Sequence, residues 1–152
     1  KRLDELEKLV ETTKKEGAKV LMGGKRPSEF NKGFYYEPTV FDNVQDDFTI
    51  MKEEPFGPLV PMLSFKSFDE VIERSNNNDL GLCSYICTNS MEQAHRASEL
   101  METGTVAVNT PVVAIAEAPF GGIKQTGYGR EGGSNAIKDY LNVKYTHLGI
   151  KG

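Results

Sequence analysis

A short acidic, proline-rich stretch holds the side chains with the clearest chemical potential. Residues 52–58 read Lys-Glu-Glu-Pro-Phe-Gly-Pro. Two prolines around one glycine stiffen the backbone, which indicates a rigid loop. An ionised glutamate only accepts hydrogen bonds, so Glu54 suits two neighbouring hydroxyls such as those of a ribose, and Phe56 offers a flat face to a ring. We interpret Glu54 and Phe56 as candidate nucleotide contacts; the alternative is a solvated corner beside a buried aromatic.

The two cysteines and two histidines are weaker candidates. Cys83 and Cys87 fall in one apolar run, without a neighbouring group that would lower a thiol pKa, so we interpret them as buried structural thiols. The absence of a disulfide pattern favours reduced thiols and a cytoplasmic localisation. His95 and His147 lack carboxylate or thiol neighbours at ligand spacing, so no metal site is expected.

Composition limits the classes of protein that this chain can belong to. Of 152 residues, 38% are hydrophobic and 26% charged, with a net charge of -4, which is typical of one soluble domain with its own core. No apolar run reaches the roughly 18 residues of a membrane-spanning helix. No cluster of Lys and Arg indicates a nucleic-acid surface. We therefore expect neither a membrane nor a nucleic acid as partner.

The elements before the loop are a helix and two strands. Apolar residues at helical spacing predict a helix from Leu3 that ends at Gly17, followed by a strand over 18–22. Residues 34–41 favour a second strand, although Pro38 points to an edge or irregular one.

After the loop, strand and helix patterns alternate. A capping box at Ser67 and a cap at Asn89 begin two helices between three apolar runs of strand length, at 59–65, 82–88 and 105–109. Such alternation predicts an α/β fold, a parallel sheet with packed helices. Ligands gather at the carboxyl ends of such strands, where Asn109 lies.

Two segments end the chain. Residues 110–133 form a long glycine-rich loop without the spacing of a dinucleotide-binding fingerprint, and loops of this length tend to be functional. A short helix is expected over 136–140. Residues 143–150 suit a strand with no hairpin partner, so we expect it to pair with another chain or a distant sheet edge.

Four motifs together carry a family resemblance. They are Gly-Phe-Tyr-Tyr-Glu-Pro-Thr-Val at 33–40, Glu-Glu-Pro-Phe-Gly-Pro at 53–58, Gly-Thr-Val-Ala-Val-Asn at 104–109, and the run from Pro119 to Glu131. In this order they resemble the carboxyl-terminal part of the NAD(P)-dependent aldehyde dehydrogenase superfamily. The resemblance implies the end of the catalytic domain of that fold for residues 1–140 and an oligomerisation strand in a tail over 141–152.

The resemblance also implies roles for single residues. Glu54 matches the glutamate that holds the nicotinamide ribose of NAD or NADP, and Phe56 the aromatic beside the nicotinamide ring. Glu131 matches a glutamate assigned in some members to a buried proton relay or structural ion pair. The alternative is that Glu131 only interacts favourably with the dipole of a helix that starts there. Residues 110–118, with Ala114 and Ile115, match the segment that lines the aldehyde entrance.

The nucleophile of the family is absent from this chain. Its Gly-Gln-x-Cys context does not occur, and the chain opens at Lys1 inside a helical pattern. We therefore expect a fragment without catalytic residues of its own, inactive alone, whose partners are the missing N-terminal part of the same protein, an aldehyde and further copies in a homo-oligomer. The alternative is a non-catalytic structural or oligomerisation module.

The substrate prediction rests on finer similarities. The Ile123-Lys124 context, the Tyr-Gly-Arg-Glu-Gly-Gly ending and Lys144-Tyr145 look most similar to the succinate-semialdehyde dehydrogenase group. This similarity implies oxidation of a semialdehyde such as succinate semialdehyde. Members of that group often carry Ser where this chain has Ala114 and Ile115, so a different semialdehyde or an aliphatic aldehyde remains open.

Overall fold

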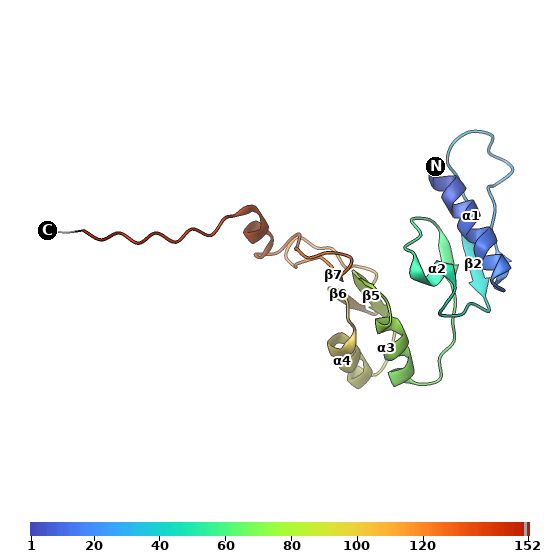
Figure 1. The fold of residues 1–152 in the computed structure, drawn as a ribbon. Helices are drawn as coiled ribbons and strands as arrows, with labels where there is room; N and C mark the ends of the chain where they lie inside the picture. The colour runs from blue at the N-terminus through green and yellow to red at the C-terminus, as the bar shows by residue number, and fades with distance from the viewer. Residues whose placement is uncertain (151) are drawn as a thin grey trace. The chain divides into compact units, whose positions relative to one another are not determined.

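The computed structural model describes residues 1–150 and 152, which form two units, Lys1–Arg74 and Ser75–Gly152. Each unit combines short strands with helices (Figure 1), so the α/β class is confirmed. Helix α3 (Phe68–Asn76) runs across the boundary between the units.

The first unit is a three-stranded sheet with helices. Its strands lie in the order β1, β2, β3, with β1 antiparallel and β3 parallel to β2. The elements are α1 (Arg2–Lys15), β1 (Lys19–Met22), β2 (Thr39–Asp42), α2 (Thr49–Lys52) and β3 (Leu59–Pro61). Helix α1 ends as expected at Gly17. This residue adopts φ +114°, a backbone conformation that residues other than glycine rarely take.

Strand β2 differs from the prediction. It begins only at Thr39, after Pro38, so the proline precedes the ladder and does not interrupt it. The strand is therefore free to occupy the centre of the sheet and not an edge. The predicted strand over 59–65 also shortens to β3, which pairs with β2 and not with the strands that follow it in the chain.

The core of this unit lies between α1 and the sheet. Figure 1 shows α1 beside β2, and Phe41 of β2 is completely buried there. Apolar side chains of α1 join Phe41 in one cluster with residues in and before α2 and at the start of β3. Its buried members are Leu6, Leu9, Val10, Phe41, Val44, Phe48, Ile50 and Leu59.

The second unit holds two two-stranded sheets among its described residues. β5 (Cys83–Ile86) is parallel to β6 (Thr105–Val108), and helix α4 (Met91–Leu100) connects them, which confirms the predicted parallel crossover. The other sheet pairs β4 (Leu80–Gly81) with β7 (Ile123–Lys124) antiparallel. The predicted cap Asn89 is wrong by one residue, because Ser90 Oγ accepts the bond from the backbone N–H of Gln93 at 3.3 Å.

The tail follows a 3₁₀ helix, η1 (Ala136–Tyr140). Residues 141–150 form no strand within the described part of the chain and extend away from η1 in Figure 1. Val143 is completely exposed, and Tyr145, Leu148 and Ile150 are at least 80% exposed. Residue 151, inside the predicted tail over 141–152, lies outside the described residues.

Candidate functional site

The loop of residues 53–58 is anchored on its N-terminal side by α2. The Glu16 carboxylate, at the end of α1, accepts bonds from the Thr49 backbone N–H at 3.1 Å and from Thr49 Oγ1 at 2.6 Å. It thereby satisfies groups at the first turn of α2 that have no partner inside the helix. Ile50 fixes the same helix by burial in the core, with 3% of its surface exposed.

The other side of the loop is held by two tight turns. The Gly57 backbone N–H donates to Pro55 O at 2.7 Å, and Leu59 N–H donates to Gly57 O at 2.9 Å. Gly57 lies directly on Leu6, since a Cβ built there would be 2.5 Å from Leu6 Cδ2. The Thr39 N–H then bonds Pro58 O at 2.8 Å as β3 begins. The loop backbone is therefore fixed at both ends, as its prolines predict.

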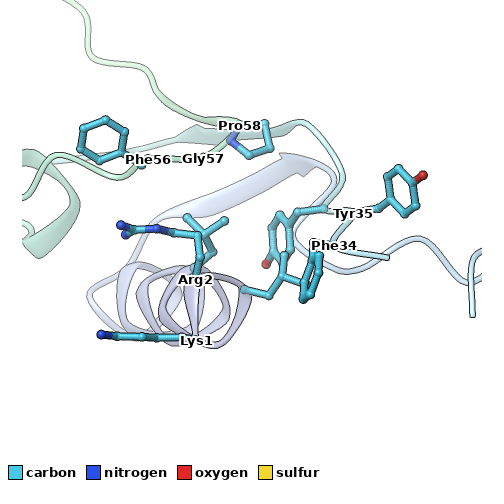
Figure 2. Close-up of a pocket in the computed structure, with 10 residues that line it drawn as sticks. Lys1, Arg2, Phe34, Tyr35, Phe56, Gly57 and Pro58 are labelled. Atoms are coloured by element: carbon cyan, nitrogen blue, oxygen red, sulfur yellow. The ribbon is translucent and has the colours of Figure 1, made fainter. Parts of the chain in front are cut away.

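The two candidate side chains project from this fixed backbone. Glu54 is exposed, and its carboxylate has no hydrogen bond or ion pair with any described residue. Phe56 is 67% exposed, and the Arg2 guanidinium lies 5.6 Å from the centre of its ring (Figure 2). The loop thus presents a free acceptor and a flat aromatic face two residues apart.

A pocket of about 550 Å³ lies beside Phe56. Figure 2 shows aromatic side chains around it, together with Lys1 and Arg2 at the start of the chain. Tyr36 contributes a buried hydroxyl that has no hydrogen-bond partner among the described residues, and burial, together with Glu7 and Glu11, raises the pKa of this phenol. The pocket is lined by Lys1, Arg2, Leu3, Leu6, Phe34, Tyr35, Tyr36, Phe56, Gly57 and Pro58. Its walls suit a flat, apolar group.

The segment with Ala114 and Ile115 belongs to the second unit. Both residues are exposed, Ile115 by 51%. Ile115 O accepts a bond from the Ala118 N–H at 3.3 Å, which closes a turn, and Ala116 O accepts one from the Gly133 N–H at 2.8 Å. The turn therefore rests on the backbone that follows Glu131.

Glu131 lies in an extended segment and not at a helix start. Its backbone N–H and C=O pair with Phe120 O and N–H, both at 2.8 Å, in an isolated antiparallel bridge. Its side chain is exposed. Glu54 and Phe56 therefore share one loop of the first unit, whereas Ala114, Ile115 and Glu131 lie in connected loops of the second.

Comparison with known proteins decides the family. The model of the aldehyde dehydrogenase family matches residues 1–146. The chain belongs to the aldehyde dehydrogenase family. It is 45% identical over 150 residues to retinal dehydrogenase 2 of Gallus gallus, covering 99% of this chain and 29% of that protein. It is 40% identical over 147 residues to mitochondrial succinate-semialdehyde dehydrogenase of Oryza sativa subsp. japonica, covering 97% and 28%.

A solved structure of the aldehyde dehydrogenase family agrees with this fold. The NAD+ complex of aldehyde dehydrogenase from Bacillus cereus superimposes with a TM-score of 0.92 at 44% identity, covering 99% of this chain and 30% of that one. The chain thus spans less than a third of the length of these relatives.

The cysteines of this family member differ from the prediction in burial. Cys83 lies in β5 and is half-buried, whereas Cys87 follows the strand and is exposed, so the two are not both buried thiols. A hydrogen bond with the Cys83 side chain raises the pKa of Tyr85. No group of three or more His, Cys, Asp or Glu within residues 1–150 and 152 could hold a metal. No helix of that part is long and apolar enough to cross a membrane.

Sequence reasoning missed Glu16, Arg2 and Tyr36. Glu16 bonds a residue 33 positions away, and no local pattern encodes such a contact. Arg2 sits in an ordinary amphipathic helix, so nothing in its spacing marks a contact with Phe56. Tyr36 had a weak signal, because three aromatic residues in succession exceed what one strand face can bury.

Proposed function

We propose that this chain is the part of an NAD- or NADP-dependent aldehyde dehydrogenase that orients the nicotinamide end of the cofactor, in an enzyme that oxidises an aldehyde to its carboxylate. The observation that carries the proposal is the Glu54 carboxylate, which has no partner among residues 1–150 and 152 and lies on a loop whose backbone is fixed at both ends. An exposed charge gains little from such rigidity unless a ligand uses it.

The residues of the loop fit the cofactor. Glu54 has two oxygens free to accept bonds from a pair of ribose hydroxyls, and Phe56 offers its exposed ring to the nicotinamide. When bound, the cofactor supplies the nicotinamide ring that accepts a hydride. The contribution of Glu54 and Phe56 is to hold the ring in one orientation, because transfer between reacting atoms needs close alignment.

For the substrate, we keep two candidates. A semialdehyde such as succinate semialdehyde is supported by the 40% identity with the rice enzyme. An uncharged apolar aldehyde is favoured by residues 110–118, which hold no Lys or Arg and expose Val112 by 59% and Ile115 by 51%. The only hydroxyl of that segment, on Thr110, already accepts a bond from the Val112 N–H at 3.1 Å. The 45% identity with retinal dehydrogenase 2 agrees with the apolar candidate.

The remaining assignments complete the proposal. Ala114 and Ile115 line the aldehyde entrance, and Glu131 supplies a proton-relay or ion-pair carboxylate to parts of the protein that precede this chain. Residues 1–140 belong to the catalytic domain, and the tail over 141–152 joins subunits of a homo-oligomer; the exposed apolar side chains of residues 143–150 support this. A cytoplasmic localisation stays a prediction.

The isolated chain should not oxidise aldehydes. It has no Gly-Gln-x-Cys sequence, and among the described residues neither Cys83 nor Cys87 has a bond to a basic side chain that would activate a thiolate. NADH formation by the isolated chain that Cys87→Ala abolishes would contradict this assignment and support a different nucleophile.

The test of the proposal is Glu54→Gln in the full-length protein. The variant keeps the shape but replaces one acceptor by a donor, so a loss of about 1.5 to 3 kcal/mol is expected from a bond to a charged group. That loss corresponds to a roughly 10- to 150-fold slower hydride step or weaker cofactor binding. Single-turnover NADH formation and cofactor titration measure both.

Glu53→Gln is the matched control, because Glu53 is the neighbouring exposed carboxylate and differs only in its position on the loop. The control should match wild type. If both variants had the hydride rate and cofactor affinity of wild type, Glu54 would be only a solvated surface residue and the proposal would lose its basis.

A further inference from the structure

Asn109 closes the carboxyl end of the parallel pair β5–β6. Its backbone N–H continues the ladder by donating to Ile86 O at 2.8 Å. Its side chain adds a reciprocal pair with the backbone of Thr88, in which Oδ1 accepts from the Thr88 N–H at 3.0 Å and Nδ2 donates to Thr88 O at 2.8 Å. The carboxamide therefore behaves as one more peptide group of the ladder.

Thr88, the partner of this bond pair, is held in place by two further hydrogen bonds of its side chain. Thr88 Oγ1 donates to Gln93 Oε1 at 2.8 Å and accepts from the Ser90 N–H at 3.1 Å. Ser90 caps α4 by accepting the Gln93 N–H. Asn109 is thus tied to the turn that begins α4.

The backbone of Asn109 carries a conformational cost. It adopts φ +55°, in the left-handed region that residues other than glycine rarely enter. Asparagine tolerates this region better than most residues, and here its side chain makes both bonds from that conformation. The left-handed residue turns the chain away from β6 and into residues 110–118.

The far end of that segment is held as well. Gly132, at φ +68°, packs so closely on it that a Cβ would be 2.7 Å from Ala118 O. Gly133 N–H bonds Ala116 O at 2.8 Å. Between the two ends, Val112 and Ile115 expose more than half of their surface. The direction set at Asn109 therefore determines where these two apolar side chains project.

We propose that Asn109 is a positioning residue for aldehyde selection, which fixes the exit of the chain from β6 and so places Val112 and Ile115 against the aliphatic part of the substrate. This inference rests on the proposed function, because it takes residues 110–118 as the aldehyde entrance. Asn109 acts through the segment that it directs and does not itself contact the aldehyde.

Three substitutions separate the components of this role. Asn109→Gly accepts the left-handed backbone but loses both side-chain bonds. Asn109→Asp keeps the acceptor for the Thr88 N–H but sets an oxygen against Thr88 O. Asn43→Gly is the matched control, since Asn43 is also left-handed, at φ 56°, and its Nδ2 also donates to a backbone carbonyl, Gly17 O at 3.0 Å, in the first unit.

The experiment measures kcat and KM of the full-length enzyme for straight-chain aldehydes from acetaldehyde to decanal, and KM for the cofactor. For Asn109→Gly and Asn109→Asp we expect the aldehyde KM to rise about three- to thirtyfold, the loss expected from one or two hydrogen bonds. The rise should be larger for long aldehydes, and the cofactor KM should not change. Asn43→Gly should leave the chain-length profile as in wild type.

Hydrogen exchange adds a readout that does not need turnover. Backbone amides of residues 110–118 should exchange faster in Asn109→Gly but not in Asn43→Gly. A lower melting temperature with unchanged exchange in this segment and an unchanged chain-length profile would overturn the inference. Wild-type enzyme without any aldehyde oxidation would contradict the proposed function instead, while the exchange comparison still decides whether Asn109 directs the segment.

Discussion

The two units differ in what holds them together. Among the described residues, the first unit buries large apolar side chains in one cluster around Phe41, whereas the buried apolar residues of the second are Ala97 and Ala107. The second unit relies on backbone approach: at Gly104 an added Cβ would overlap Gly121 O. One unit is therefore specified by side-chain packing within the chain, and the other by glycines and hydrogen bonds.

This difference matches the roles proposed for them. A loop that orients a cofactor needs a fixed base, and residues 53–58 have one in Glu16, Ile50 and Leu6. The second unit instead ends in a tail, residues 141–150, in which every residue is exposed, including the apolar Val143 and Ile150. Exposed apolar residues in succession mark a surface that other protein covers. We expect assembly to bury the tail of the second unit, whereas the first unit already has a buried core of its own.

The largest effect should come from removing the tail. In the full-length protein, truncation after Tyr140 removes the tail, whose described residues form no strand of their own and whose exposed apolar side chains we propose to join subunits. We expect a lower association state, because the pairing and its apolar burial are lost together. The molar mass from light scattering at micromolar concentration measures it.

Two point variants sharpen the tail experiment. Tyr145→Pro removes a backbone donor that a strand pair needs, and Lys144→Gln, at the next position, changes only an exposed side chain. The proline variant should dissociate and the glutamine variant should not. A truncated protein of unchanged mass would count against the assembly role.

The second prediction concerns the core of the first unit. Phe41→Ala removes a completely buried ring and should lower the free energy of unfolding by about 3 to 5 kcal/mol. Phe34→Ala is the control, since Phe34 is 91% exposed and its loss should change stability by less than about 0.5 kcal/mol. Urea denaturation followed by circular dichroism compares them. Similar midpoints would show that the cluster around Phe41 does not hold the unit.

Local pattern predicted the elements better than their pairing. The spacing of Leu3 to Val10 predicted α1, and the strand, helix, strand order around α4 predicted β5 parallel to β6. The partner of β3 was not predictable, because strand pairing depends on side chains from distant segments. The sequence also could not decide between Asn89 and Ser90 as the cap of α4, because both residue types cap helices and the backbone conformation selects one of them.

The candidate site was predictable where chemistry is local. The two prolines around Gly57 predicted a fixed loop, and its backbone bonds confirm this. The support from Glu16 was not predictable, because it joins segments 33 residues apart. The left-handed backbone of Asn109 was not predictable either, because asparagine at a strand end is common. Only the structure shows the two bonds to Thr88 that its side chain makes from this conformation.

The smallest effect should be a pH dependence at the start of α3, a helix in which no residue is fully buried. The Glu70 carboxylate accepts the Lys66 backbone N–H at 2.8 Å and bonds Arg74 at 3.0 Å. These bonds, the backbone one first, hold the pKa of Glu70 below its usual 4.5. A carboxyl group whose pKa is lower in the folded state stabilises the fold above the unfolded value, and this stabilisation is lost as the pH falls through the folded pKa. Glu70→Gln should therefore be less stable than wild type at pH 7, and the difference should shrink below about pH 4.5.

Glu73→Gln serves as the control for that measurement, because Glu73 is exposed on the same helix and has no ion pair or hydrogen bond from its side chain among the described residues. Urea midpoints of the three proteins between pH 3 and pH 7 give the comparison. The effect should be small, since both members of the Glu70–Arg74 pair lie at the surface, where ion pairs are screened by water and salt. A stability difference between wild type and Glu70→Gln that stays constant across this range would show that the charge of the carboxylate does not stabilise α3. The loss would then come from the different shape of the amide side chain.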